Sequence, residues 1–135
     1  MHCSGLLDRD LERVLYGRAK LCPTVNAMAC YDGYDEVNER VYKILGSGGL
    51  SLGDPVSAFR ELFAEDELAV AGDVDEHQEL VSLLLTDDAA ASAFRSAGMN
   101  AVLTRHTYAH RAAQVCSLLA YPMTPSLQPE APSIG

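Results

Sequence analysis

The order of apolar segments along this 135-residue chain predicts an α/β domain with a small parallel sheet flanked by helices. Short apolar runs that are typical of strands alternate with stretches in which apolar residues recur at helical spacing. Parallel strands joined by helices in right-handed crossovers are the arrangement that this alternation favours. About three strands are expected, within residues 21–28, 50–52 and 67–71, and three helices are expected after the last of them, the final two in succession at the end of the domain.

The first helix is expected at residues 8–16, with Gly17 as its stop. Its apolar residues fall on one side, at Leu11, Val14 and Leu15. Residues 21–28 then read as a short buried strand or strand-loop, interrupted near Pro23, and residues 31–34 read as a turn.

The clearest helix signal lies at residues 35–45, where one apolar stripe is formed by Val37, Val41, Ile44 and Leu45. Acid-before-base pairs at i, i+4 spacing lie on another side, Glu36 with Arg40 and Glu39 with Lys43. Three glycines follow the helix and precede a strand, which is the reverse of a phosphate-binding P-loop. We therefore expect Gly46, Gly48 and Gly49 to end the helix and to let the backbone pass close to a ligand or neighbour.

Four further helices are expected in the second half of the chain. The first begins with Asp54 as N-cap and Pro55 as first helical residue, and runs to Phe63. The second is capped by Asp73 or Asp75 and runs to residue 85, with a core stripe of Leu80, Leu83 and Leu84.

The last two helices are expected at residues 87–103, capped by Thr86, and from residue 108 to about 120, capped by Thr107. Residues 122–135 hold four of the six prolines and show no periodicity. They are expected to form a flexible tail, which places the domain at residues 1–121.

The formal net charge of −9 argues against a nucleic-acid backbone or an anionic membrane surface as partner. The most apolar run, at residues 80–85, is far shorter than a membrane span, and the N-terminal segment lacks the basic region of a signal peptide. The four cysteines contain no C-x-x-C pair, so we interpret them as reduced, mostly buried thiols of a cytoplasmic protein.

Three stretches, in the same order along the chain, resemble the spore-protein YkvP/CgeB glycosyltransferase-like family, the C-terminal part of a GT-B glycosyltransferase. They are NERVYKILGSGG at residues 38–49, DPVSAFRELF with the following ELAVAGDVDEHQELVSLLL at 54–85, and SAGMNAVLTRHTYAHRAAQV at 96–115. The resemblance covers roughly residues 10–119, and its most specific piece is HTYAHR.

The resemblance implies a Rossmann-like domain that binds a nucleoside-diphosphate sugar, with the nucleotide sugar as substrate and no separate cofactor. In such enzymes an N-terminal Rossmann-like half supplies much of the acceptor site, and this half and the first strands of the donor domain are expected to be missing here. Glycosyl transfer would then need that half, and exposed apolar surface is expected to bind it or a second copy of the chain. The alternative is a non-catalytic binding or assembly module on the same fold.

The resemblance places the donor near residues 34–49. The family pattern usually has a glutamate that binds the donor ribose at the position of Lys43, whereas lysine cannot accept a hydrogen bond and could only meet an anion. The earlier acidic position of the pattern falls on Asp35, and Arg40 matches an arginine that could hold a diphosphate oxygen. Tyr31 or Tyr34 could stack on a base, and the backbone could approach the donor closely at Gly48 and Gly49. Ion pairs of Lys43 with Glu39 and of Arg40 with Glu36 are the structural alternatives.

His106 and His110 are four residues apart at the start of the last expected helix, a spacing that could suit a metal ion, but the sequence offers no third ligand nearby. The favoured interpretation is that His106 fixes the start of the helix with Thr107. His110 and Arg111 would then make a packing or inter-domain contact, and His106 could also take part in an inter-domain contact. No metal is expected, because arginine, lysine and helix N-termini can stabilise a departing diphosphate. The sequence assigns no catalytic residue.

Overall fold

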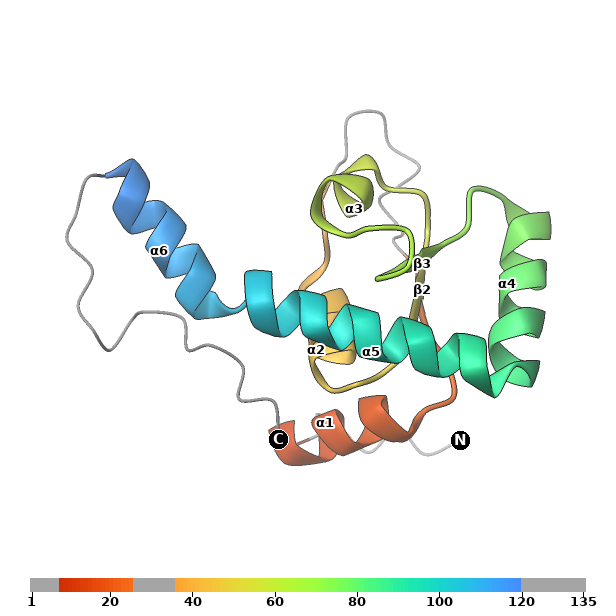
Figure 1. The fold of residues 1–135 in the computed structure, drawn as a ribbon. Coiled ribbons are helices and arrows are strands. Elements are labelled where there is room, and N and C mark those ends of the chain that lie inside the picture. The colour runs from red at the N-terminus through yellow and green to blue at the C-terminus, as the bar shows by residue number, and fades with distance from the viewer. Residues whose placement is uncertain (1–7, 26–35, 120–135) are drawn as a thin grey trace.

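The computed structural model describes residues 8–25 and 36–119, and it confirms the predicted fold class (Figure 1). Three short parallel strands form one sheet in the order β1-β2-β3. The elements are α1 Arg9–Arg18, β1 Cys22–Thr24, α2 Glu39–Gly46, β2 Ser51–Gly53, α3 Ser57–Leu62, β3 Ala69–Val70, α4 Val74–Thr86, α5 Asp88–Arg105 and α6 Tyr108–Leu118.

The central strand β2 is entirely buried, and two hydroxyl groups join it to β1. The Thr24 hydroxyl donates to the Leu52 carbonyl over 3.2 Å and lies 3.1 Å from the Ser51 hydroxyl. Because the single proton of Thr24 is used on Leu52, the Ser51 hydroxyl donates to Thr24. Both hydroxyls are thus satisfied inside the sheet, where an unpaired polar group would be costly.

The sheet separates two hydrophobic clusters, because neighbouring residues of a strand point to opposite faces. One face is covered by α2, α3 and the C-terminal half of α5, and the other by α4 and the N-terminal part of α5. The first cluster consists of Val41, Leu45, Val56, Phe59, Phe63, Leu68, Ala101 and Val102. The second consists of Leu50, Leu52, Ala69, Ala71, Leu84 and Ala91.

The glycines after α2 end the helix, as the sequence predicts. Gly48 has a positive φ of 71°, its N–H donates to the Leu45 carbonyl over 2.9 Å, and the Gly49 N–H donates to the Ile44 carbonyl over 2.9 Å. This is the Schellman pattern, which uses glycine because other residues pay for the left-handed conformation. The expected close backbone approach is also present, since Gly49 faces the Tyr16 carbonyl of α1.

Arg95 of α5 fastens this turn to the segment between α1 and β1. Its guanidinium donates to the carbonyls of Gly48, Ala19 and Lys20 over 3.1, 2.7 and 2.7 Å. One side chain therefore binds the end of α2, the end of α1 and the approach to the sheet. This role could not be predicted from the sequence, because the three acceptors are backbone atoms far from Arg95 in the chain.

Several expected helix boundaries were wrong, and each correction has a local cause. Helix α2 begins at Glu39 rather than Asp35, because the Asn38 side chain caps it by accepting the Arg40 N–H over 2.9 Å. Helix α3 begins at Ser57, because Val56 is buried with an extended backbone and cannot be the second helical residue.

Two further boundaries also differ from the prediction. Asp87, not Thr86, caps α5, where its carboxylate accepts two backbone N–H groups. Gly17 does not stop α1, which continues to Arg18. Its missing side chain serves instead to admit the Ser47 carbonyl, which would lie 2.8 Å from a Cβ at Gly17.

Other expectations about caps are confirmed. Asp73 caps α4 and Thr107 caps α6.

Cys22 and Cys116 are partly buried free thiols, and burial raises the pKa of Cys22. The expected turn at 31–34 and tail at 122–135 lie outside the described residues, as do Cys3 and Cys30.

The apolar sides of two helices are more exposed than their patterns suggest. In α4 Leu84 is buried and Leu80 packs against the core, but Leu83 is 44% exposed. In α1 the residues Leu11, Val14 and Leu15 are all exposed, at 57, 48 and 53%. Since α1 is amphipathic but its apolar side is not buried, periodicity alone identified the helix and not its partner.

Replacing Gly49 with alanine is expected to lower the free energy of unfolding by about 2 kcal/mol, because the new methyl group overlaps well-packed backbone. A Cβ at this position would lie 2.7 Å from the Tyr16 carbonyl oxygen and 2.9 Å from that of Ile44. Urea denaturation of the variant measures the loss.

Gly72→Ala is the matched control, because a Cβ there meets only the Glu76 Oε2 atom, the end of a flexible side chain, at 3.0 Å. Its stability should change by less than about 0.5 kcal/mol. Equal losses in the two variants would contradict a steric role of Gly49.

Candidate functional site

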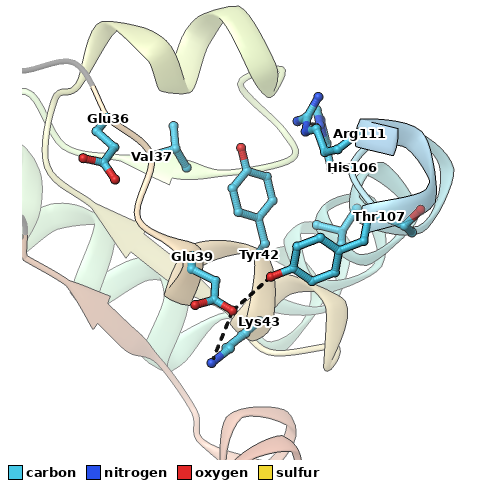
Figure 2. Close-up of a pocket in the computed structure, with 10 residues that line it drawn as sticks. Glu36, Val37, Glu39, Tyr42, Lys43, His106, Thr107 and Arg111 are labelled. Carbon is cyan, nitrogen blue, oxygen red and sulfur yellow. Dashed lines mark hydrogen bonds and ion pairs between the residues drawn. The ribbon is translucent and has the colours of Figure 1, made fainter. Parts of the chain in front are cut away.

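A cleft of about 440 Å³ lies between α2 and the junction of α5 with α6 (Figure 2). We call it the α2–α6 cleft. One wall is formed by α2 and the residues before it, and the other by the end of α5 and the first turn of α6. Its lining residues are Glu36, Val37, Glu39, Tyr42, Lys43, Val102, His106, Thr107, Tyr108 and Arg111.

The α2 wall follows from the amphipathic pattern of that helix. Val41, Ile44 and Leu45 point into the core, as predicted from their spacing. The opposite side therefore presents Glu39 and Lys43, one turn apart, to the cleft. Tyr42 lies between these two sides, and its ring stands between Val37 and the pair His106 and Arg111 (Figure 2).

An aromatic group of three rings supports the back of the cleft. The ring centroids of Tyr42 and Phe63 lie 5.7 Å apart, those of Tyr42 and His106 lie 5.7 Å apart, and those of Phe63 and His106 lie 4.8 Å apart. Their tilted arrangement is a favourable geometry for such rings. His106 is thereby fixed as part of the wall rather than as a free surface residue.

Both ring nitrogens of His106 are used. Its Nε2 atom lies 3.0 Å from the Leu62 carbonyl, and its Nδ1 atom lies 2.8 Å from an Nη2 atom of Arg111. A guanidinium can only donate, so Nδ1 accepts, and the proton is on Nε2, which donates to Leu62. Burial lowers the pKa of His106, and the nearby positive charges of Arg111 and Arg105 lower it further. The environment therefore favours the neutral ring.

The junction between α5 and α6 is fixed by a reciprocal cap. The Thr107 side chain accepts the His110 N–H, and His110 Nδ1 accepts the Thr107 N–H over 3.3 Å. His110 Nδ1 also lies 2.6 Å from the Thr107 hydroxyl. This confirms that the segment around Thr107 fixes the start of the last helix. It is His110, however, that completes the cap, while His106 ends α5.

Charged groups at the mouth of the cleft form a short network. Lys43 Nζ lies 3.6 Å from a carboxylate oxygen of Glu12 and 3.6 Å from one of Glu39. The Tyr108 hydroxyl donates to Glu39 over 3.3 Å and so connects α6 to α2. The predicted ion pair of Lys43 with Glu39 is confirmed, and Glu12 of α1 is a second partner that sequence spacing did not indicate.

The residues predicted to bind a donor are only partly brought together. Lys43 lines the α2–α6 cleft, whereas Arg40 lines a separate hollow of about 10 Å³ at the end of β1. Gly48 and Gly49 lie beyond the opposite end of α2. Tyr34 and Asp35 lie outside the described residues.

The three residues predicted for an inter-domain contact have different positions. His106 and Arg111 line the cleft, while His110 caps α6. Tyr42 and Tyr108 also line the cleft but were missed by sequence reasoning. Tyr108 could have been found, since it follows the cap of a predicted helix within the HTYAHR stretch.

Among residues 8–25 and 36–119, no group of three or more metal-ligating side chains is close enough to hold an ion. In the same part of the chain, no helix has the length and apolarity needed to cross a bilayer.

The partly buried, neutral state of His106 predicts a pH-dependent stability. Because the pKa of His106 is lowered from 6.5, the unfolded chain binds the proton more readily than the folded protein. The free energy of unfolding contributed by His106 is therefore present above about pH 6.5 and lost as the pH falls through the lower pKa of the folded state.

Urea denaturation between about pH 7.5 and pH 5.5 should show a smaller change with pH in His106→Phe than in the unmodified protein. Phenylalanine keeps a ring in the aromatic group and removes the titrating nitrogens. Equal pH dependence of the two proteins would contradict this assignment.

Residues 10–117 match the sequence model of a family described as glycosyl transferase-like. No curated protein and no solved structure matched the chain. The matched range includes α2 and most of α6, and therefore both walls of the cleft. It supports the broader family and not the YkvP/CgeB family in particular. Since the match covers most of its length, the chain belongs to the glycosyl transferase-like family.

Proposed function

We propose that this domain binds a nucleoside-diphosphate sugar and acts in glycosyl transfer together with an N-terminal half. The observation that carries the proposal is the construction of the α2–α6 cleft. Most of its lining residues come from NERVYKILGSGG and from HTYAHR, stretches far apart in the chain that both lie within the range of the family match. Residues from these two stretches meet directly in the contact between Glu39 and Tyr108.

The lining of the cleft has the chemistry that a nucleotide sugar needs. Lys43 and Arg111 offer positive charge to a diphosphate, and the Tyr42 ring offers an aromatic surface. The Glu39 carboxylate can accept hydrogen bonds from sugar hydroxyls. These groups lie in a cleft whose size is within the range of small-molecule sites.

Arg40 has a distinct place in the proposal. It lies in the first turn of α2, beside Thr24 at the carboxyl end of β1. Ligands of parallel α/β sheets bind outside the carboxyl ends of the strands. The cleft reaches this end of α2 through Val37 and Glu39, so Arg40 is proposed to contact the donor from that edge.

The second candidate function is a non-catalytic binding or assembly module. The position of Lys43 between Glu12 and Glu39 favours it, because two carboxylates already balance the charge of this lysine. In that case the fold would have been kept while the donor site lost its function.

Calorimetric titration with UDP, GDP and their sugars tests donor binding. We expect at least one nucleotide to bind with a Kd in the millimolar range or tighter, and Lys43→Gln to weaken its binding about tenfold, the loss of one charge-assisted contact. Lys20→Gln, which removes an exposed lysine outside the cleft, is the matched control and should bind as the unmodified protein does.

No binding at millimolar nucleotide would overturn the proposal. Stronger binding by Lys43→Glu than by the unmodified protein would instead support the module with a degenerate donor site.

The exposed apolar side chains of α1 and α6 support the proposed partner. Leu118 and Leu119 at the end of α6 are 86 and 72% exposed, and none of the α6 residues is buried. Such surface is normally covered by another protein surface. We assign it to contact with an N-terminal glycosyltransferase half or with a second copy of the chain.

Sedimentation at increasing protein concentration tests this surface. The protein alone is expected to self-associate, and Leu118→Ser should reduce the association because it removes exposed apolar area. Leu85→Ser, at a 43% exposed leucine of α4, is the matched control and should leave association unchanged. A strictly monomeric protein at high concentration would contradict self-association.

A further inference from the structure

We propose that Arg111 is an anion-binding residue of the α2–α6 cleft and that neutral His106 is the positioning residue that aims it. The identification of the anion as the diphosphate of a nucleotide rests on the proposed function. The existence of an anion site at Arg111 does not depend on it.

The contacts of Arg111 hold it without neutralising it. One terminal nitrogen donates to His106 Nδ1 over 2.8 Å, and the other donates to Gln114 Oε1 over 2.9 Å. Both acceptors are uncharged groups. Three of the five N–H donors of a guanidinium remain after these two bonds, which is enough for a bidentate contact with a phosphate.

Two other cations of the domain are paired with carboxylates, and a third has its donors used on backbone oxygens. Arg105 forms an ion pair with Glu67 over 2.6 Å, Lys43 contacts two carboxylates, and Arg95 is used on three backbone carbonyls. Within residues 8–25 and 36–119, no carboxylate forms an ion pair with Arg111. A fixed cation that lines a cleft and forms no ion pair with a carboxylate of these described residues is suited to bind an incoming anion.

His106 can aim Arg111 only while Nδ1 is free of a proton. The groups around the imidazole are the Tyr42 and Phe63 rings and the Leu62 carbonyl. Its charged neighbours are Arg105, Arg111 and Glu67. The Leu62 carbonyl fixes the remaining proton on Nε2. A protonated ring would present an N–H to the guanidinium, and the contact that aims Arg111 would be lost.

Titration of the folded protein with inorganic pyrophosphate, and separately with UDP and GDP, tests the inference. We expect Arg111→Gln to weaken pyrophosphate binding at least tenfold. Arg18→Gln removes the same charge from the exposed end of α1, outside the cleft, and should change binding less than twofold.

Two substitutions of His106 separate aiming from packing. His106→Phe keeps a ring but has no acceptor, and should weaken pyrophosphate binding several-fold. His106→Asn places an amide oxygen near the position of Nδ1 and should restore most of the affinity, although it loses the Leu62 contact as the phenylalanine variant does. In an Arg111→Gln background, His106→Phe should have no further effect, because the residue acts through Arg111.

The outcomes distinguish this inference from the proposed function. Pyrophosphate binding that depends on Arg111, without binding of UDP or GDP, would support the anion site and overturn nucleotide binding. Nucleotide binding that Arg111→Gln leaves unchanged would overturn the inference and keep the function. No pyrophosphate binding, or equal weakening by His106→Phe with and without Arg111, would also overturn it. Circular dichroism of each variant verifies that the fold is retained.

Discussion

The close contact between α2 and α5 is the constraint on which the cleft depends. Gly98 permits it, since a Cβ there would lie 2.6 Å from the Glu67 carbonyl and 2.8 Å from a methyl group of Leu45. Ala101 and Val102 continue the contact into the core. Helix α5 ends at Arg105, and the next residue, His106, begins the junction with α6. Because α5 lies so near α2, the His106 ring contacts the ring of Tyr42. A larger residue at position 98 would move both walls of the cleft relative to one another.

The small sheet positions the helices around it but supplies only part of the buried apolar surface. Its strands are two or three residues long, so much of the buried apolar surface belongs to the helices on either face. Because the strands are short, they form few hydrogen bonds. Arg95 adds three more, to backbone carbonyls around the turn after α2. Hydrogen bonds from a charged group to such acceptors are among the stronger ones in proteins.

Local patterns in the sequence predicted the fold class and the helices that carry the two walls of the cleft. The stripe of Val41, Ile44 and Leu45 placed α2, and Thr107 marked the start of α6, because helix period and capping are properties of neighbouring residues. The contacts between these helices and their neighbours could not be predicted in this way. The contacts of His106 with Leu62 and of Lys43 with Glu12 join residues that only the packing of helices brings together. The exposure of Leu83 was not predicted for the same reason. Periodicity shows which side of a helix is apolar, but not how much of that side a neighbouring element covers.

The attachment of α6 has a thermodynamic consequence. This helix has no buried residue, projects from the body of the domain and is fixed at its first turn, the same turn that carries Arg111 (Figure 1). A protein surface that reorients α6 on docking would also reorient that arginine. Occupancy of the cleft and docking on α6 would then share one coupling free energy, so each would change the affinity of the other by the same factor.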